Sequence, residues 1–232
     1  MKGLCGAVRT AGCMLALALL PLAAPSAYAE EAVSVSVTQG ADWISTVKMG
    51  IMTVKKAPQY AAWIETADGK YVQTLMVTSR AANGKWRAAP AKGRPEALPV
   101  WFAAKASGAT KGDIDAATSA TPEAGAAVTG KAGGLVPGKE YVVRFEINHS
   151  FDYNATWPKD AKEGEAGFSG VNGQPSLVYE ARFVAGKQAV VSLRPVGHGA
   201  VDGSSGALMA GTDGMTSALT IVGSVIVTVK GE

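Results

Sequence analysis

The chain has 232 residues, a formal net charge of +3 and 47% hydrophobic residues. This composition excludes a disordered protein, and the net charge lacks the large excess of basic residues that is typical of nucleic-acid-binding proteins. Its two cysteines, Cys5 and Cys13, both lie near the N-terminus, so the rest of the chain has no thiol for a disulfide, a nucleophile or a metal ligand.

Residues 1–29 are organised as a cleavable secretory signal. Lys2 and Arg9 provide the positive charge, an apolar run follows, and Ala27-Tyr28-Ala29 is a small-residue cleavage pattern. We therefore expect cleavage after Ala29, a periplasmic location and a cysteine-free mature chain. Residues 30–232 are expected to form a single β-sandwich domain, because their length suits one core.

Alternating apolar and polar residues predict strands over the first part of this domain. The first strand is expected over residues 33–37 and the second over residues 46–54. Residues 59–66 and 71–78 form the clearest unit, a β-hairpin. Asp68-Gly69 lies between its two strands, and these residue types accept the positive φ that a tight turn requires.

Residues 79–139 lack this alternation and are rich in Ala, Gly, Pro and Lys. A segment of this length inside a domain is expected to carry some order of its own. Residues 97–106 are expected to form a short helix or an irregular strand that packs Trp101 and Phe102 into the core. The first part of this region, residues 80–96, also holds five basic residues opposed only by Glu96, which we interpret as solvated loop charge. They are Arg80, Lys85, Arg87, Lys92 and Arg94.

Residues 141–148 alternate strictly and predict the central strand of the domain. Their apolar face is expected to be buried and their polar face to point outward, and His149 continues the apolar row into a loop. The apolar face consists of Tyr141, Val143, Phe145 and Ile147.

A further strand is predicted over residues 176–185, with a tight turn at Gly186-Lys187 into residues 189–193. If this strand lies beside the central one, charged residues of the two strands should pair across the outer face. These residues are Arg144 and Glu146 on one strand, and Glu180 and Arg182 on the other.

A Gly-rich loop over residues 197–214 leads into the C-terminal part. Asp213 is expected to cap a short helix over residues 215–222, and residues 225–229 are expected to form the last strand. The uncharged run 214–229 is too short for a membrane-spanning helix, so no transmembrane segment is expected in the mature protein. About seven to nine short strands with little helix predict a mainly β fold, an antiparallel β-sandwich.

Three residues could form a metal site with two histidines and one carboxylate: His149, Asp152 and His198. The spacing neither requires nor forbids such a site, and a histidine bonded to backbone at the rim of the sandwich is the alternative. The chain has no G-x-S-x-G motif and no phosphate-binding loop, so we expect no enzymatic activity.

Aromatic and amide residues gather in the loop that follows the central strand, notably Tyr153, Asn154 and Trp157. Flat rings and amides together can bind a small molecule or a sugar, although such aromatics can equally anchor a long loop. If the loops 148–176 and 197–214 lie at one end of the sandwich, Tyr153 and Asn154 should converge there with the candidate metal ligands.

Four segments in order resemble a family of predicted periplasmic proteins, the domain of unknown function numbered twenty-two seventy-one. They are PQYAAWIETADGKYVQTLMV, DIDAATSATPEAG, VPGKEYVVRFEIN with its continuation NHSFDYNATWP, and NGQPSLVYEA. The resemblance implies an exported, immunoglobulin-like β-sandwich with no established reaction. It also implies an accessory role beside a periplasmic or inner-membrane partner in redox chemistry or in iron or metal acquisition.

Residues 115–121 are also similar to the acceptor motif at which exported flavoproteins receive covalent flavin mononucleotide (FMN). By that match Thr121 would be the attachment point and Asp115 the upstream acidic residue, with Ser119 where the motif has Gly. The other interpretation is a polar Ala-Thr-Ser loop. Our first functional hypothesis is therefore a non-enzymatic binding or interaction module without a cofactor. An electron carrier with FMN at Thr121 and a purely structural envelope protein are the alternatives.

Overall fold

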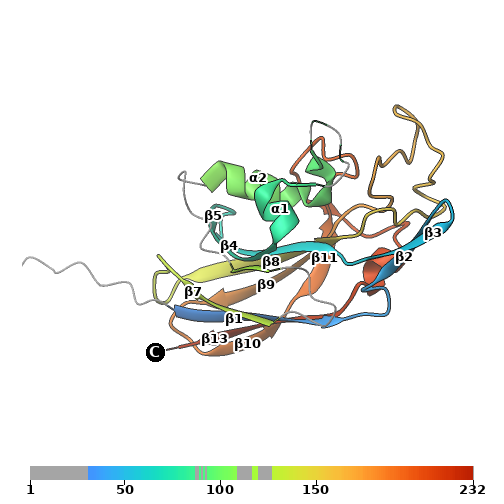
Figure 1. Cartoon of the computed structure of the whole chain (residues 1–232). Helices are drawn as coiled ribbons and strands as arrows, with labels where there is room; N and C mark the ends of the chain where they lie inside the picture. The colour runs from blue at the N-terminus through green and yellow to red at the C-terminus, as the bar shows by residue number, and fades with distance from the viewer. Residues whose placement is uncertain are drawn as a thin grey trace, which may run out of the picture.

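The computed structural model of this chain describes residues 31–86, 89, 91, 93–108, 117–119 and 127–231. The expected signal peptide lies outside these residues, and so do Asp115 and Thr121. The described part consists of two β-sheets packed face to face, with helices on the outer face of the larger sheet (Figure 1). The prediction of a mainly β, antiparallel sandwich is confirmed.

The larger sheet has the strand order β12-β11-β9-β8-β4-β5-β6, and the smaller sheet has the order β10-β13-β1-β7. The neighbouring pairs are antiparallel except β5 and β6, which are parallel. The strands of the larger sheet are β4 (Gln59–Thr66), β5 (Tyr71–Thr78), β6 (Ala117–Ser119), β8 (Glu140–Asn148), β9 (Leu177–Val184), β11 (Arg194–His198) and β12 (Met209–Ala210). Those of the smaller sheet are β1 (Glu31–Gln39), β7 (Ala127–Ala132), β10 (Ala189–Ser192) and β13 (Val222–Lys230).

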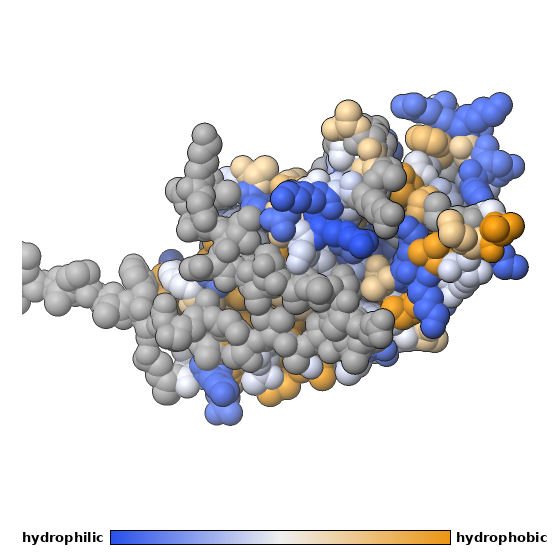
Figure 2. Space-filling model, in the orientation of Figure 1, coloured by the Kyte–Doolittle hydropathy of each residue, from blue (hydrophilic) through white to orange (hydrophobic). Residues whose placement is uncertain are grey.

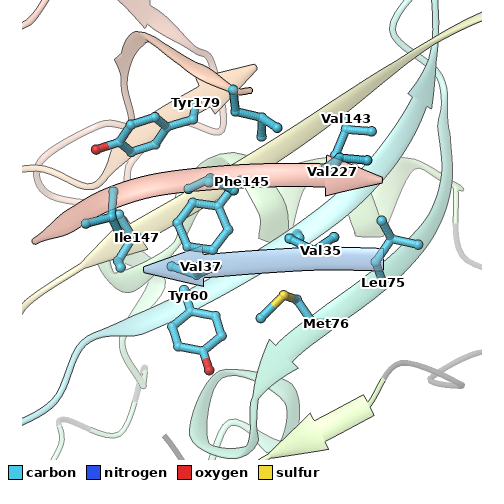
Figure 3. Packing of buried hydrophobic residues seen from close by; sticks show 14 of the residues in the cluster. Val35, Val37, Tyr60, Leu75, Met76, Val143, Phe145, Ile147, Tyr179 and Val227 are labelled. Carbon is cyan, nitrogen blue, oxygen red and sulfur yellow. The ribbon is translucent and has the colours of Figure 1, made fainter. Parts of the chain in front are cut away.

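The main core lies between the two sheets, as the alternation of β8 predicts. Tyr141, Val143, Phe145 and Ile147 are all buried there, facing valines of β1 and β13 (Figure 3). Phe145 sits at the centre, with its ring 5.8 Å from that of Tyr60 on β4 and 6.1 Å from that of Tyr179 on β9. Aromatic pairs at this separation add to the energy of burial.

Both predicted tight turns are present. Gly69 has φ 83° between β4 and β5, and the Thr66 nitrogen donates to the Lys70 carbonyl at 2.8 Å. Gly186 has φ 78° after β9, and the turn there carries the chain into β10, which pairs with β13 in the other sheet. The second turn therefore connects the two layers and does not form a hairpin within one sheet.

The single strand predicted over residues 46–54 is wrong. The chain instead forms two strands, β2 (Ser45–Met49) and β3 (Met52–Lys56), in a separate two-stranded sheet. Met49 pairs with Met52, so Gly50 and Ile51 form a two-residue turn, and Gly50 supplies the positive φ of 63° that this tight turn needs. In Figure 1 this hairpin projects from the end of the sandwich opposite the C-terminus.

Helices form a third layer over the outer face of the larger sheet (Figure 1). They are α1 (Ser79–Asn83), the 3-10 turn η1 (Pro95–Ala97) and α2 (Pro99–Gly108). The helix expected near residues 97–106 is thus present as α2, but Trp101 is buried between α2 and the sheet and not in the main core. The expectation that β8 exposes its polar face is wrong at Glu146, which is buried and contacts the first turn of α2.

Of the two ion pairs predicted between β8 and β9, the pair of Arg144 is present, whereas Arg182 has a different partner. Arg144 Nε lies 3.1 Å from Glu180 Oε2, as the register of β8 and β9 requires. Arg182 pairs with Glu140 at 2.7 Å and not with Glu146. The register of β8 and β9 places Arg182 opposite Val142, two residues from Glu140, whereas Glu146 is opposite Val178 and lies under α2.

The C-terminal strand is present as β13, with Val225, Val227 and Val229 buried. The helix before it is only the 3-10 turn η2 (Ser217–Thr220), and Thr216 occupies its N-cap position, so the prediction that Asp213 caps this helix is wrong. Among the described residues, no helix is both long and apolar enough to cross a membrane.

Candidate functional site

The loop between β8 and β9 folds back on itself at the end of the sheets. Backbone hydrogen bonds join Phe151 to Val171 and Asp152 to Asn172, both at 2.7 Å. Gly173 forms a β-bridge with Asp152 and has φ 81°, and a Cβ at this glycine would collide with the Asp152 backbone. The two arms of the loop can approach this closely because position 173 has no side chain.

His149 is buried and fixes the start of this loop to a distant segment. Its Nε2 lies 2.9 Å from the Asp42 carbonyl oxygen, which can only accept, so Nε2 carries the proton. Burial lowers the pKa of His149 from its ordinary 6.5. His149 therefore acts as a neutral structural link between β8 and the segment after β1.

Asp152 is tied to η2 and does not point into open space. Its Oδ1 accepts a hydrogen bond from Ser217 Oγ at 2.5 Å, and burial raises the pKa of this carboxyl. Gln174 supports the same junction, because its Oε1 accepts from the Thr216 nitrogen at 2.6 Å.

His198 ends β11, and its Nδ1 lies 2.8 Å from the Gly199 carbonyl oxygen. Strand β9 separates β11 from β8, the strand that leads into His149. Across the described ranges, no group of three or more His, Cys, Asp or Glu side chains could hold a metal ion. The predicted convergence of His149, Asp152 and His198 into one ligand set is therefore wrong, and both histidines bond to backbone oxygens instead.

The predicted platform residues have different positions. Trp157 is buried in the main core, which matches the alternative that aromatics anchor the loop. The Asn154 Nδ2 donates to the Gly214 carbonyl at 2.8 Å, so this side chain also serves to hold the loop. Tyr153 borders a pocket.

This pocket lies between the β2–β3 hairpin and the β8–β9 loop and has a volume of about 640 Å³. The hairpin side provides a short run of small residues and a lysine, and the loop side provides two rings and a second lysine. The lining residues are Thr46, Val47, Lys48, Gly50, Phe151, Tyr153 and Lys159. The sequence predicted Tyr153 as a site residue but did not predict the residues from the hairpin. The signal that could have revealed the hairpin was Gly50, which indicates a turn.

The aromatic side of the pocket is held in a defined arrangement. Phe151 has φ 64°, a left-handed conformation that is strained for a residue with a bulky side chain. Its ring lies 6.4 Å from that of Tyr153, and the Lys56 ammonium lies 4.5 Å from its centroid. The Tyr153 hydroxyl donates to the Gly170 carbonyl at 2.7 Å, which fixes the second ring.

Behind this loop is a buried network centred on Arg94, a residue that was expected to be solvated. Arg94 Nε lies 3.0 Å from Glu96 Oε1, and Nη1 donates to Ser150 Oγ at 2.6 Å. Its Nη2 donates to Asn172 Oδ1, and Asn172 Nδ2 donates to the Glu96 carbonyl at 2.6 Å. A buried cation is tolerated only with such a full set of partners, and these partners join the segment before α2 to both arms of the loop.

Glu146 is also buried, although the alternation of β8 predicted it on the solvent-facing side of the strand. It accepts hydrogen bonds from the backbone nitrogens of Val100 at 3.3 Å and Trp101 at 2.8 Å, and from Ser176 Oγ at 2.6 Å. Burial raises its pKa to about 7, against the opposing effect of these donors. Glu146 therefore caps the first turn of α2 from the sheet below, which is a structural role.

A scan against models of protein families, a search of curated proteins and a search of solved structures each returned no match. The resemblance to the periplasmic family of unknown function therefore stays a prediction from the four sequence segments. The covalent-flavin hypothesis likewise stays a prediction, because Asp115 and Thr121 lie outside the described residues.

Proposed function

We propose that this protein is an exported, non-enzymatic binding module whose ligand site is the pocket between the β2–β3 hairpin and the β8–β9 loop. The observation that supports this most is the lining of the pocket, where two rings lie beside two lysines from different segments. These residues are Phe151, Tyr153, Lys48 and Lys159.

The chemistry of the lining favours a small organic anion that carries a flat or apolar part. Phe151 and Tyr153 offer ring faces for stacking, and the ammonium groups of Lys48 and Lys159 complement a carboxylate or a sulfonate. A volume of about 640 Å³ falls within the range typical of small-molecule sites, roughly 300–1,000 Å³.

The loop side of the site is held in place without a ligand. The Tyr153 hydroxyl bond and the Arg94 network both anchor the β8–β9 loop. Less conformational freedom is then lost on binding, which raises the affinity. The lining residues include no histidine or carboxylate that could serve as a general base, which supports binding over catalysis.

The implied accessory role in an extracytoplasmic redox or metal-acquisition system is part of this proposal. Organic chelators that carry metals are commonly anionic, because carboxylate and phenolate oxygens are the metal ligands. A lysine-bearing aromatic pocket suits that class of molecule.

The test is a fluorescence titration with anilinonaphthalene sulfonate, a flat organic anion, followed by displacement with benzoate and salicylate. We expect saturable binding that Tyr153→Ala or Lys159→Gln weakens about tenfold, equivalent to about 1.4 kcal/mol. Tyr153→Phe keeps the ring and should retain binding. Lys187→Gln, in the exposed turn at the opposite end of the sheets, is the matched charge control. Equal affinity in the Tyr153→Ala and wild-type proteins would show that this pocket is not the site.

A further inference from the structure

The tip of the β2–β3 hairpin exposes large apolar side chains. Ile51 is fully exposed and Met52 is 64% exposed. In Figure 2 hydrophobic colour appears at the end of the molecule where Figure 1 shows this hairpin. Adjacent exposed side chains of this size are unusual on a soluble surface and indicate an interaction site.

The geometry of the hairpin holds these side chains outward. The turn at Gly50-Ile51 joins two five-residue strands that pair only with each other in the described structure. A strand of this length extends about 17 Å, since each residue adds about 3.4 Å. The apolar tip is therefore convex and stands away from the two packed sheets.

The charged residues of the hairpin itself have one sign. The sequence contains no Asp or Glu from Trp43 to Ile64, whereas it contains Lys48, Lys55 and Lys56. Lys48 and Lys55 are exposed on the two strands of the hairpin. The remainder of the chain is close to neutral, so this positive charge is concentrated on the projecting element.

We propose that the β2–β3 hairpin docks on an anionic lipid surface, with Ile51 and Met52 inserted at the level of the headgroups and Lys48 and Lys55 on lipid phosphates. An apolar tip surrounded by lysines combines the two contributions that drive interfacial membrane binding, apolar burial and attraction to anionic lipid. A convex tip suits a lipid surface because headgroups rearrange around it, whereas a protein partner would need a preformed acidic hollow.

This docking does not rest on the small-molecule proposal, although the two sites are neighbours and Lys48 belongs to both. Gly50 and Lys48 line the pocket, whereas Ile51 and Met52 do not. Loss of one activity can therefore be separated from loss of the other by substitution.

The test is flotation with vesicles of phosphatidylcholine that contain about 30% phosphatidylglycerol, compared with phosphatidylcholine alone. We expect binding to the anionic vesicles only, with a decrease as salt is raised. The double variant Ile51→Ser/Met52→Ser and the double variant Lys48→Gln/Lys55→Gln should each reduce the bound fraction at least about tenfold. Tyr153→Ala should leave vesicle binding unchanged.

Two control variants match these changes on another part of the surface. Val190→Ser removes an exposed apolar side chain, 69% exposed on β10, and Lys187→Gln removes an exposed charge. Neither should alter flotation, and all variants should keep the wild-type circular dichroism spectrum. Absence of binding to anionic vesicles, or binding that survives Ile51→Ser/Met52→Ser, would overturn the proposal. A concentration-dependent dimer abolished by the same variant, without vesicle binding, would assign the tip to a second copy of the chain.

Discussion

The carboxylate of Glu146, on the central strand β8, lies 2.8 Å from the backbone nitrogen of Trp101 in the first turn of α2. A side chain from the sheet thus caps the helix that covers it, and one buried carboxyl group links the two layers. Backbone nitrogens at a helix start have no partner within the helix, so this contact supplies one.

Stability should fall as the pH rises through the titration of Glu146. Its folded pKa is about 7 against an ordinary value of 4.5, so the folded protein binds more protons between these two pH values. Folding stability is therefore greatest below about pH 4.5 with respect to this group, and it is lost as the pH rises to about 7. Glu146→Gln should remove a difference of a few kcal/mol between urea unfolding at pH 5 and pH 8, since one pKa unit corresponds to about 1.4 kcal/mol.

Comparison of the slopes of wild type and Glu146→Gln cancels the contribution of the other titrating groups. Identical slopes in wild type and Glu146→Gln would contradict the assignment.

Removal of Arg94 should destabilise the protein strongly. Arg94→Met leaves the Glu96 carboxylate buried without its cation, which typically costs about 3–5 kcal/mol. The double variant Arg94→Met/Glu96→Gln should recover part of this loss, because no buried charge remains. Urea unfolding of the single and double variants measures the coupling. The exposed pair of Arg182 and Glu140 is the comparison, and Arg182→Ala should cost less than about 1 kcal/mol.

Gly173 should be the least replaceable glycine of the β8–β9 loop. Gly173→Ala adds a Cβ that collides with the Asp152 backbone at a position with positive φ, and we expect a loss of about 2–4 kcal/mol in thermal or urea unfolding. Gly170 also has positive φ but has open space around it, so Gly170→Ala should cost only about 1 kcal/mol. Equal losses at both positions would mean that the close contact at Gly173 has no energetic weight.

The intact mass and absorbance spectrum of the protein from its native host test export and the flavin alternative together. We expect the mass of residues 30–232 without a visible absorption band. An added flavin mononucleotide mass with yellow absorbance, mapped to the peptide that contains Thr121, would instead establish an electron carrier. A mass that includes residues 1–29 would contradict cleavage after Ala29.

The core-facing sides of several strands were predictable because strand faces follow from local alternation. Successive side chains of a strand point to opposite sides, so Phe145 and Ile147 had to share a face whatever packed on it. Asp68-Gly69 likewise specified its turn through the φ preferences of two residues. The turn at Gly50 was missed because its flanking residues continue the strand-like pattern on both sides.

The candidate site was only partly predictable. Tyr153 was identified from its aromatic loop, but the residues that complete the pocket come from Thr46 to Gly50, about a hundred positions earlier. His149, Asp152 and His198 carry metal-ligand chemistry, yet their partners are a backbone carbonyl, a serine hydroxyl and another backbone carbonyl. Residue type alone does not show which of these partners a fold supplies.

The sequence by itself determined the strands β1, β4, β5, β8, β9, β10 and β13, the core-facing side of β8 and the position of two tight turns, because these features depend on neighbours along the chain. The tertiary structure decided which segments cover the outer face of the larger sheet. It also decided that Glu146 and Arg94 are buried. It also decided which loops meet at the end of the sheets. The physical reason is that the path of the chain between distant segments sets these contacts, and local periodicity carries no information about that path.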